Sequence, residues 1–227
     1  MNGSLHLLIG AVLFFGGHVI LSSPALRPAL MERLGQRGFT MLYSALAMIG
    51  LVWLIYGFAV APRQRWWGGT GLAVVPLVLM APASLLLVAA FTQKNPTAIG
   101  QGGALSAADA RGIQRITRHP FLWAVVLWAV GHLVVNGNFP ALVLFGGMLA
   151  LALSGAAAID RRSRERDPVS WTAFTGRTSN VPFAAIMAGR NRLVWSEIGW
   201  GRAAAAAVLY VALILAHPFV TGASPLG

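Results

Sequence analysis

Six long runs of apolar residues constrain this chain more than any other feature of its sequence. Most of them approach the roughly 20 residues that a helix needs to cross a hydrocarbon layer of about 30 Å. Backbone amides in lipid must bond within their own segment, so such runs form helices rather than strands. The sequence therefore predicts an all-α polytopic membrane helix bundle with about six transmembrane helices, forming a single integral membrane domain over residues 1–227. The runs cover approximately residues 5–21, 39–61, 70–91, 121–135, 140–159 and 203–220.

Composition supports a membrane protein and limits its chemistry. Hydrophobic residues make up 57% of the chain and charged residues only 10%, whereas about a quarter of a soluble domain is charged. The chain contains no cysteine. Disulfides, thiolate-ligated haem and cysteine-ligated iron–sulfur clusters are therefore excluded within it.

The net charge of +11 follows the predicted membrane topology rather than indicating nucleic-acid binding. With six crossings, residues 22–38, 92–120 and 160–202 lie on one side of the membrane and hold 15 of the 17 basic residues. The opposite side holds only Arg63 and Arg65. Because positive loops stay in the cytoplasm, both termini are expected to be periplasmic. We therefore expect the protein to interact with membrane lipid and not with nucleic acid.

Two stretches on the positive side are expected to lie in the membrane interface. Ser106–Arg118 begins with a plausible helix cap and becomes basic, which is typical of an interfacial helix. Ser170–Arg202 mixes aromatic residues with arginines, a combination that suits the headgroup layer. The sequence leaves open whether the second stretch also closes a site.

Turn and glycine signals add local expectations. Asn136-Gly137 predicts a tight turn between the fourth and fifth helices, and Pro140 suits the first turn of the next helix. The glycine positions 16–17, 131 and 146–147 allow close approach of either helices or a flat ligand.

Histidines are the most informative polar residues of the apolar runs. These runs contain no Asp, Glu, Lys or Arg, so His18, His132 and His217 are candidate functional groups. A neutral imidazole can ligate a metal, and His132 lies about 18 Å from the cytoplasmic side, close in height to His217. His18 lies about 10 Å from that side. His119 is about 20 Å from His132 along one helix, so the two cannot share a metal ion. Alternatively, each buried ring simply bonds a carbonyl across a helix interface.

Three motifs in order resemble the NnrU family of bacterial membrane proteins, which is named for its link to nitric oxide and denitrification genes. The resemblance runs from His18 to Ser224, and the plant and cyanobacterial zeta-carotene isomerases share its domain. It implies the bacterial inner membrane as the location. The motifs are "GIQRITRHPFLWAVVLWAVGH" (112–132), "TSNVPFAAIMAGRN" (178–191) and "AHPFVTGAS" (216–224).

The resemblance also implies a cofactor and its ligands. The isomerases are described as haem b proteins in which reduced iron drives cis-to-trans isomerisation of a double bond. Their two histidine ligands fall on His18 and His132, and their alternative thiolate ligand falls on Ala129, so a cysteine-for-histidine exchange is impossible here. On depth grounds His217 is a substitute ligand, and Arg118 can pair with a haem propionate. An apolar small-molecule substrate is implied, while the catalytic residues and the electron donor are unidentified.

Two other functions remain open from the sequence. The "RHP" of residues 118–120 and the "ERDPVSWTAF" segment resemble isoprenylcysteine and phospholipid methyltransferases. That resemblance implies S-adenosylmethionine binding by Arg118 and His119, but the acidic pair of those enzymes is poorly matched around Asp160 and Glu165. The third interpretation is a non-catalytic accessory membrane protein whose histidines only pack.

Overall fold

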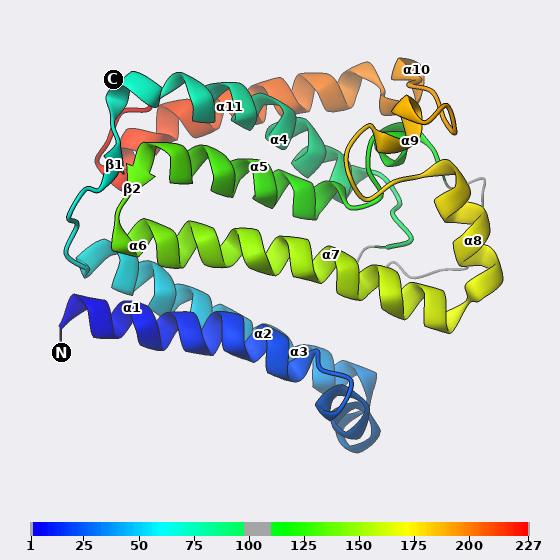
Figure 1. Cartoon of the computed structure of the whole chain (residues 1–227), viewed down its shortest axis with the longest axis horizontal. Helices are drawn as coiled ribbons and strands as arrows, with labels where there is room; N and C mark the ends of the chain where they lie inside the picture. Colours follow the sequence, from blue (N-terminus) through cyan, green and yellow to red (C-terminus); the bar gives the residue numbers. More distant parts are fainter. Residues whose placement is uncertain (1, 98–109, 227) are drawn as a thin grey trace. The chain divides into compact units, whose positions relative to one another are not determined.

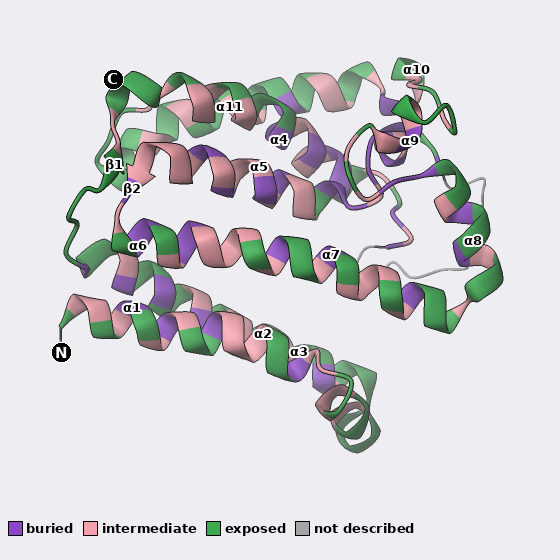
Figure 2. Cartoon of the chain, in the orientation of Figure 1, coloured by how far each residue is buried: buried purple, intermediate pink, exposed green. Residues whose placement is uncertain are grey.

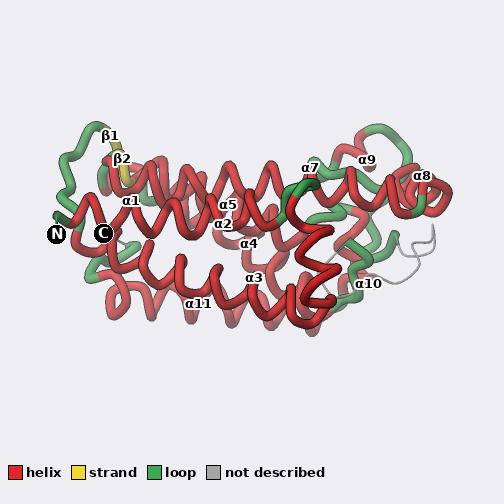
Figure 3. The backbone as a smooth tube through the Cα atoms, turned by 90° about the horizontal axis from the view of Figure 1, so that it is seen from below, coloured by secondary structure: helices red, strands yellow, loops and turns green. Residues whose placement is uncertain are grey.

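The computed structural model describes residues 2–97 and 110–226, and these residues are almost entirely helical (Figures 1 and 3). The all-α prediction is therefore confirmed. The label η marks short π- or 3₁₀-helical segments. The elements are α1 (Gly3–Ala11), η1 (Val12–Gly16), α2 (Gly17–Leu21), α3 (Leu26–Val60), β1 (Trp67–Gly68), η2 (Thr70–Leu72), α4 (Val74–Thr92), η4 (Gly112–Arg115), α5 (Pro120–Val135), β2 (Asn136–Gly137), α6 (Phe139–Ala141), η5 (Leu142–Gly146), α7 (Gly147–Arg166), α8 (Pro168–Arg177), α9 (Ala184–Met187), α10 (Trp195–Ile198) and α11 (Trp200–Thr221).

Five helices in the described part of the chain are long and apolar enough to cross a membrane. They identify the chain as an integral membrane protein. The sixth predicted span is α5, an apolar helix of 16 residues, which is about 24 Å long. The five are Gly3–Leu21, Leu26–Val60, Val74–Thr92, Phe139–Arg166 and Trp200–Thr221.

Contacts group the residues into two compact units. The first unit comprises residues 1–68 and 132–151, and the second comprises residues 69–131 and 152–227. The helices α5 and α7 each contribute residues to both units. A single domain over the whole chain remains a prediction.

Glycines bring the helices of the first unit into close contact. The helices α1 and α3 run antiparallel (Figure 1). A Cβ atom added to Gly10 would collide with the backbone at Leu54, and one added to Gly57 would collide with the backbone at Leu7. Such contacts are available only to small residues. These glycines therefore form a tightly packed helical hairpin.

The predicted turn after α5 is present in the first unit. Asn136 and Gly137 form the short strand β2, which pairs antiparallel with β1. The side chain of Asn138 accepts a hydrogen bond from the Ala141 backbone N–H and caps α6, with Pro140 in its first turn. The sequence did not reveal the pairing with β1, because two-residue strands leave no hydrophobic period.

The helices α4 and α11 lie side by side in the second unit. Tyr210 donates a hydrogen bond to the Leu77 carbonyl at 3.0 Å, and Arg202 donates to the Thr92 carbonyl at 3.0 Å. Figure 2 shows that much of the remaining surface of α11 is exposed. An apolar helix with such a surface suits contact with lipid. The buried core of this unit contains Ala83, Leu86, Ala89, Ile113, Ile116, Ala124 and Ile198.

The predicted interfacial helix over Ser106–Arg118 is absent in its described part. Residues 106–109 lie outside the described residues, and the remainder forms only the 3₁₀ turn η4. Long-range hydrogen bonds replace helical ones here, because the Gly112 N–H donates to Glu197 and the Arg118 N–H donates to the Ser179 carbonyl. The second predicted stretch does contain short helices, α8 to α10.

Candidate functional site

The ring of His18 is oriented by a hydrogen bond to the backbone of the preceding helical turn. Its Nδ1 lies 2.7 Å from the Phe14 carbonyl oxygen. A carbonyl only accepts hydrogen bonds, so Nδ1 carries the proton and Nε2 keeps its lone pair. Metal-ligating histidines commonly donate their other ring N–H to a carbonyl in this way. The ring contacts Phe14 and, edge-on, Tyr43, with centroids 4.5 and 5.2 Å away.

His132 belongs to the same compact unit and has an aromatic partner of its own. Its ring stacks on Phe145 with centroids 4.9 Å apart and an interplanar angle of 28°. Phe145 in turn contacts Phe58 of α3 edge-on at 5.7 Å. The imidazole of His132 is therefore packed against aromatic side chains inside the apolar part of the unit.

Two π-helical segments support these histidines. Both η1 and η5 end in Phe-Gly, at residues 15–16 and 145–146, and in each case a second glycine begins the next helix. The Phe15 ring fills the position that a Cβ atom would take on Gly147. Phe14 of η1 contacts His18 and Phe145 of η5 contacts His132, so each segment supplies an aromatic ring to one candidate ligand. Single π-helical turns within α-helices frequently occur at functional sites.

The predicted glycines divide into two kinds. A Cβ atom on Gly131 would lie 3.0 Å from the Pro76 Cα atom, so this glycine serves helix packing. The structure describes no atom within 4 Å of a Cβ built on Gly17 or Gly146. The Cβ positions of Gly17, beside His18, and of Gly146, next to Phe145, are therefore not filled by a neighbouring helix, whereas that of Gly131 is.

The two histidines are anchored at different heights on α3. His18 contacts Tyr43, whereas His132 reaches Phe58 through Phe145. Tyr43 and Phe58 are fifteen positions apart on α3, or about 22 Å along the helix. Joint ligation of one iron by His18 and His132 remains a prediction.

His217 lies in the second unit, whereas His18 and His132 belong to the first. It is partly buried near the end of α11, and its Nδ1 lies 2.8 Å from the Ala223 carbonyl and 3.1 Å from the Thr221 hydroxyl. These are local contacts at a helix end. Its role as a substitute ligand remains a prediction.

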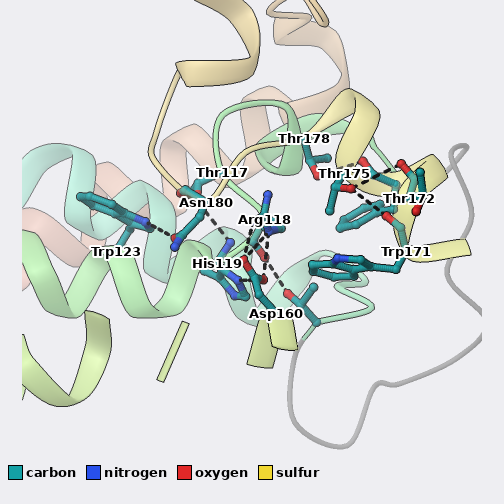
Figure 4. A network of polar contacts seen from close by, with 12 residues as sticks. Thr117, Arg118, His119, Trp123, Asp160, Trp171, Thr172, Thr175, Thr178 and Asn180 are labelled. Carbon is teal, nitrogen blue, oxygen red and sulfur yellow. Dashed lines mark hydrogen bonds and ion pairs between the residues drawn. The ribbon is translucent and has the colours of Figure 1, made fainter. Parts of the chain in front are cut away.

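Arg118 and His119 converge on Asp160, which the sequence analysis named only as a poor match to the acidic pair of the methyltransferases. Figure 4 shows both side chains directed at Asp160 of α7. His119, which is 3% exposed, places Nε2 2.7 Å from Asp160 Oδ1. The Arg118 Nε lies 3.0 Å from the same oxygen, and its Nη2 donates to Oδ2. The guanidinium also lies over the Trp171 ring, 5.4 Å from its centroid.

The polar groups of Arg118, His119 and Asp160 are paired within this cluster. The carboxylate of Asp160 accepts from two side chains, and the charge of Arg118 is paired with it. A buried pair of this kind is stable only when its remaining donors and acceptors are also satisfied. A cofactor role for Arg118 and His119 remains a prediction. In the sequence, Asp160 could be recognised by its position, because it directly follows an apolar run and precedes a run of arginines.

Hydrogen bonds connect the motif of residues 178–191 to the segment before α5 and to α5 itself. The Thr117 hydroxyl donates to the Asn180 carbonyl at 2.6 Å, and the Trp123 indole donates to the Asn180 side chain at 3.1 Å (Figure 4). Arg115 donates to Glu197 from Nε and Nη2, both at 2.7 Å. Together with the Gly112 backbone N–H, Arg115 lowers the pKa of Glu197 from 4.5 to about 2. These bonds give two sequence motifs one rigid framework.

One family model covers nearly the whole chain, and two curated relatives cover half of it or less. The family model described as "NnrU protein" matches residues 6–225. The chain is 37% identical over 116 residues to "15-cis-zeta-carotene isomerase, chloroplastic" of Arabidopsis thaliana, covering 50% of this chain and 32% of that protein. It is 40% identical over 82 residues to the Zea mays protein of the same name, covering 36% of this chain and 22% of the relative. No solved structure matches.

Proposed function

This chain belongs to the NnrU family, and from that premise we propose that it is a haem b-binding membrane protein in which His18 and His132 ligate the iron. The supporting observation is the bond from His18 Nδ1 to the Phe14 carbonyl. It fixes the tautomer in which Nε2 is available to a metal.

The surroundings of the histidines also suit a large flat cofactor. The open positions at Gly17 and Gly146 provide space next to the π-helical segments. Phe14 and Phe145 place aromatic rings against the two imidazoles. When bound, haem would supply a redox-active iron whose potential depends on its axial ligands and the burial of the site. The protein's part is to orient the imidazoles and to exclude water from them.

The activity proposed for this centre is a redox-dependent cis–trans isomerisation of an apolar substrate. The proteins named zeta-carotene isomerase support this proposal, although the aligned part of this chain spans about a third or less of their length. Ala129 is fully buried and has no ligating atom, so it takes no part in a ligand exchange. A nitric oxide or denitrification role, suggested by the family resemblance, would use the same iron site.

The methyltransferase alternative has weaker support from the geometry. It requires Arg118, His119 and the segment after Asp160 to hold S-adenosylmethionine. In the structure the side chains of Arg118 and His119 both bond to the Asp160 carboxylate. Methyl transfer from radiolabelled S-adenosylmethionine to membrane lipid would favour this alternative. A non-catalytic accessory protein would neither bind haem nor transfer methyl groups.

Absorption spectroscopy tests the proposal without an activity assay. The protein is expressed with a haem supply, purified in detergent, and measured oxidised and reduced. We expect a Soret band that His18→Gly and His132→Gly each weaken or shift, and that added imidazole restores. The matched controls are His119→Gly and His217→Gly, which should leave the band unchanged. A folded wild-type protein that remains colourless would contradict the proposal.

A further inference from the structure

The segment Asn180–Arg190 exposes apolar side chains next to arginines. Val181, Phe183 and Met187 are 56%, 45% and 84% exposed. We define these three residues as the apolar tip. Met187 is the last residue of the short helix α9, and Val181 and Phe183 precede that helix. Large apolar side chains at such exposure indicate a contact with something other than water.

The apolar tip is held rigidly rather than being loosely folded. The Phe183 N–H donates to the Ile116 carbonyl at 2.8 Å, and the Ala185 N–H donates to the Ser179 hydroxyl at 2.9 Å. Phe183 has a left-handed backbone, with φ of 65°, which is strained for a bulky side chain. The surrounding hydrogen bonds thus hold the segment in a conformation that presents the Phe183 ring outward.

The position of the tip matches the boundary of a membrane. In the second unit α4 ends at Thr92 and α11 begins at Trp200, and both helices are apolar enough to span a bilayer. Arg202 joins these two ends by donating to Thr92. Trp195 and Trp200 are also strongly exposed there. Tryptophan is enriched where hydrocarbon meets the headgroups.

The charge around the tip favours an anionic surface. Residues 170–202 contain four arginines and a single acidic residue, Glu197, which is already paired with Arg115. Arg177 and Arg192 are exposed. Guanidinium groups bind phosphate through paired hydrogen bonds, and arginines near a membrane are attracted to anionic lipids.

We propose that the apolar tip inserts into the boundary between headgroups and acyl chains, while Arg177 and Arg192 bind the phosphates of anionic phospholipids. The arrangement is preorganised, since the 178–191 motif is bonded to the segment before α5 independently of any lipid. The motif is therefore a lipid-binding element in addition to a connection between helices.

Spin labelling tests the insertion, because the chain has no cysteine to remove. Labels are placed by Val181→Cys and Met187→Cys in nanodiscs containing phosphatidylglycerol. Val208→Cys on the exposed surface of α11 serves as the lipid reference, and Glu165→Cys near the end of α7 serves as the water reference. We expect the ratio of oxygen to nickel-chelate accessibility at both tip positions to exceed the Glu165 ratio several-fold. Ratios equal to that at Glu165 would overturn the insertion.

Hydrogen exchange on the unmodified chain tests the anion preference. The amides of residues 181–189 should exchange several-fold more slowly in phosphatidylglycerol nanodiscs than in phosphatidylcholine nanodiscs. The double substitution Arg177→Gln with Arg192→Gln should remove this difference. Equal rates in the two lipids for the wild-type chain would overturn the anionic contact, whatever the haem content of the sample.

Discussion

Individual arginines of this protein hold separate parts of the chain together. Arg118 joins the start of α5 to Asp160 of α7, and Arg115 joins η4 to Glu197 of α10. Arg190 donates to carbonyl oxygens at the end of α8, including that of Thr175, where a helix dipole favours a positive charge. Arginine suits these positions because its planar group makes several fixed hydrogen bonds. The excess of arginine thus has a structural use besides setting membrane topology.

Replacement of Asp160 by asparagine should destabilise the protein. The substitution keeps an oxygen acceptor but leaves the charge of Arg118 without its partner, and breaking a buried pair costs about 3–5 kcal/mol. Thermal unfolding in detergent measures the loss. The double variant Asp160→Asn with Arg118→Met should recover part of it, because it removes the unpaired charge. An Asp160→Asn protein as stable as the wild type would show that the cluster contributes nothing.

The Arg115–Glu197 pair should make stability depend on acid pH. The folded pKa of Glu197 is lowered from 4.5 to about 2, so its contribution is complete above pH 4.5 and is lost as the pH falls towards 2. Since both side chains are partly exposed, we expect about 1 kcal/mol. The melting temperatures of the wild type and Glu197→Gln should therefore converge between pH 5 and pH 3. Parallel curves over that range would contradict this assignment.

Glycines act at the scale of whole elements, in two opposite ways. The space that a Cβ atom would take on Gly10 or Gly57 is occupied by the backbone of the facing helix. These glycines therefore determine how closely α1 and α3 approach. Gly17 and Gly146 have open space at the Cβ position and follow or end a π-helical segment. The same residue type therefore closes one helix interface and leaves room beside a histidine.

A pair of alanine substitutions separates these two uses. Gly57→Ala should destabilise the fold by about 1–3 kcal/mol, because the added methyl group overpacks a backbone contact. Gly17→Ala should be neutral or stabilise the fold by about 0.5–1 kcal/mol, since alanine favours the helix. Thermal unfolding of the haem-free proteins measures both effects. If Gly17→Ala also lowers the haem content, the open space belongs to the cofactor site.

The sequence predicted the elements better than the contacts between them. Apolar length identified the helices, and the Asn136-Gly137 signal located a turn. The π-helical segments were missed, because one extra residue in a turn hardly alters an all-apolar pattern. The left-handed Phe183 was missed because hydrogen bonds from distant residues impose it. Asp160 was undervalued, since a carboxylate next to arginines looks like a solvated end of a helix until its partners are known.

At the scale of the whole molecule, charge and helix length give one consistent topology. An even number of crossings places the two termini on the same side as residues 62–69, which carry only two arginines. With six crossings, the remaining 15 basic residues are expected on the other side. Translocating those arginines would oppose the positive-inside preference. We therefore expect the cluster of Arg118, His119 and Asp160 to face the cytoplasm.

Cysteine labelling of the cysteine-free chain tests this topology. Gln64→Cys and Ser224→Cys, both exposed, should react with a membrane-impermeant maleimide in spheroplasts of the expressing bacterium. Glu165→Cys should react only after the membrane is permeabilised, because the arginines around it retain that side in the cytoplasm. The wild-type chain should give no label in either condition. Labelling of Glu165→Cys in intact spheroplasts, with neither Gln64→Cys nor Ser224→Cys labelled, would reverse the orientation. Labelling of only one of Gln64→Cys and Ser224→Cys would instead change the number of crossings by one. In that last case α5, which is the shortest of the apolar helices, would be the segment that does not cross.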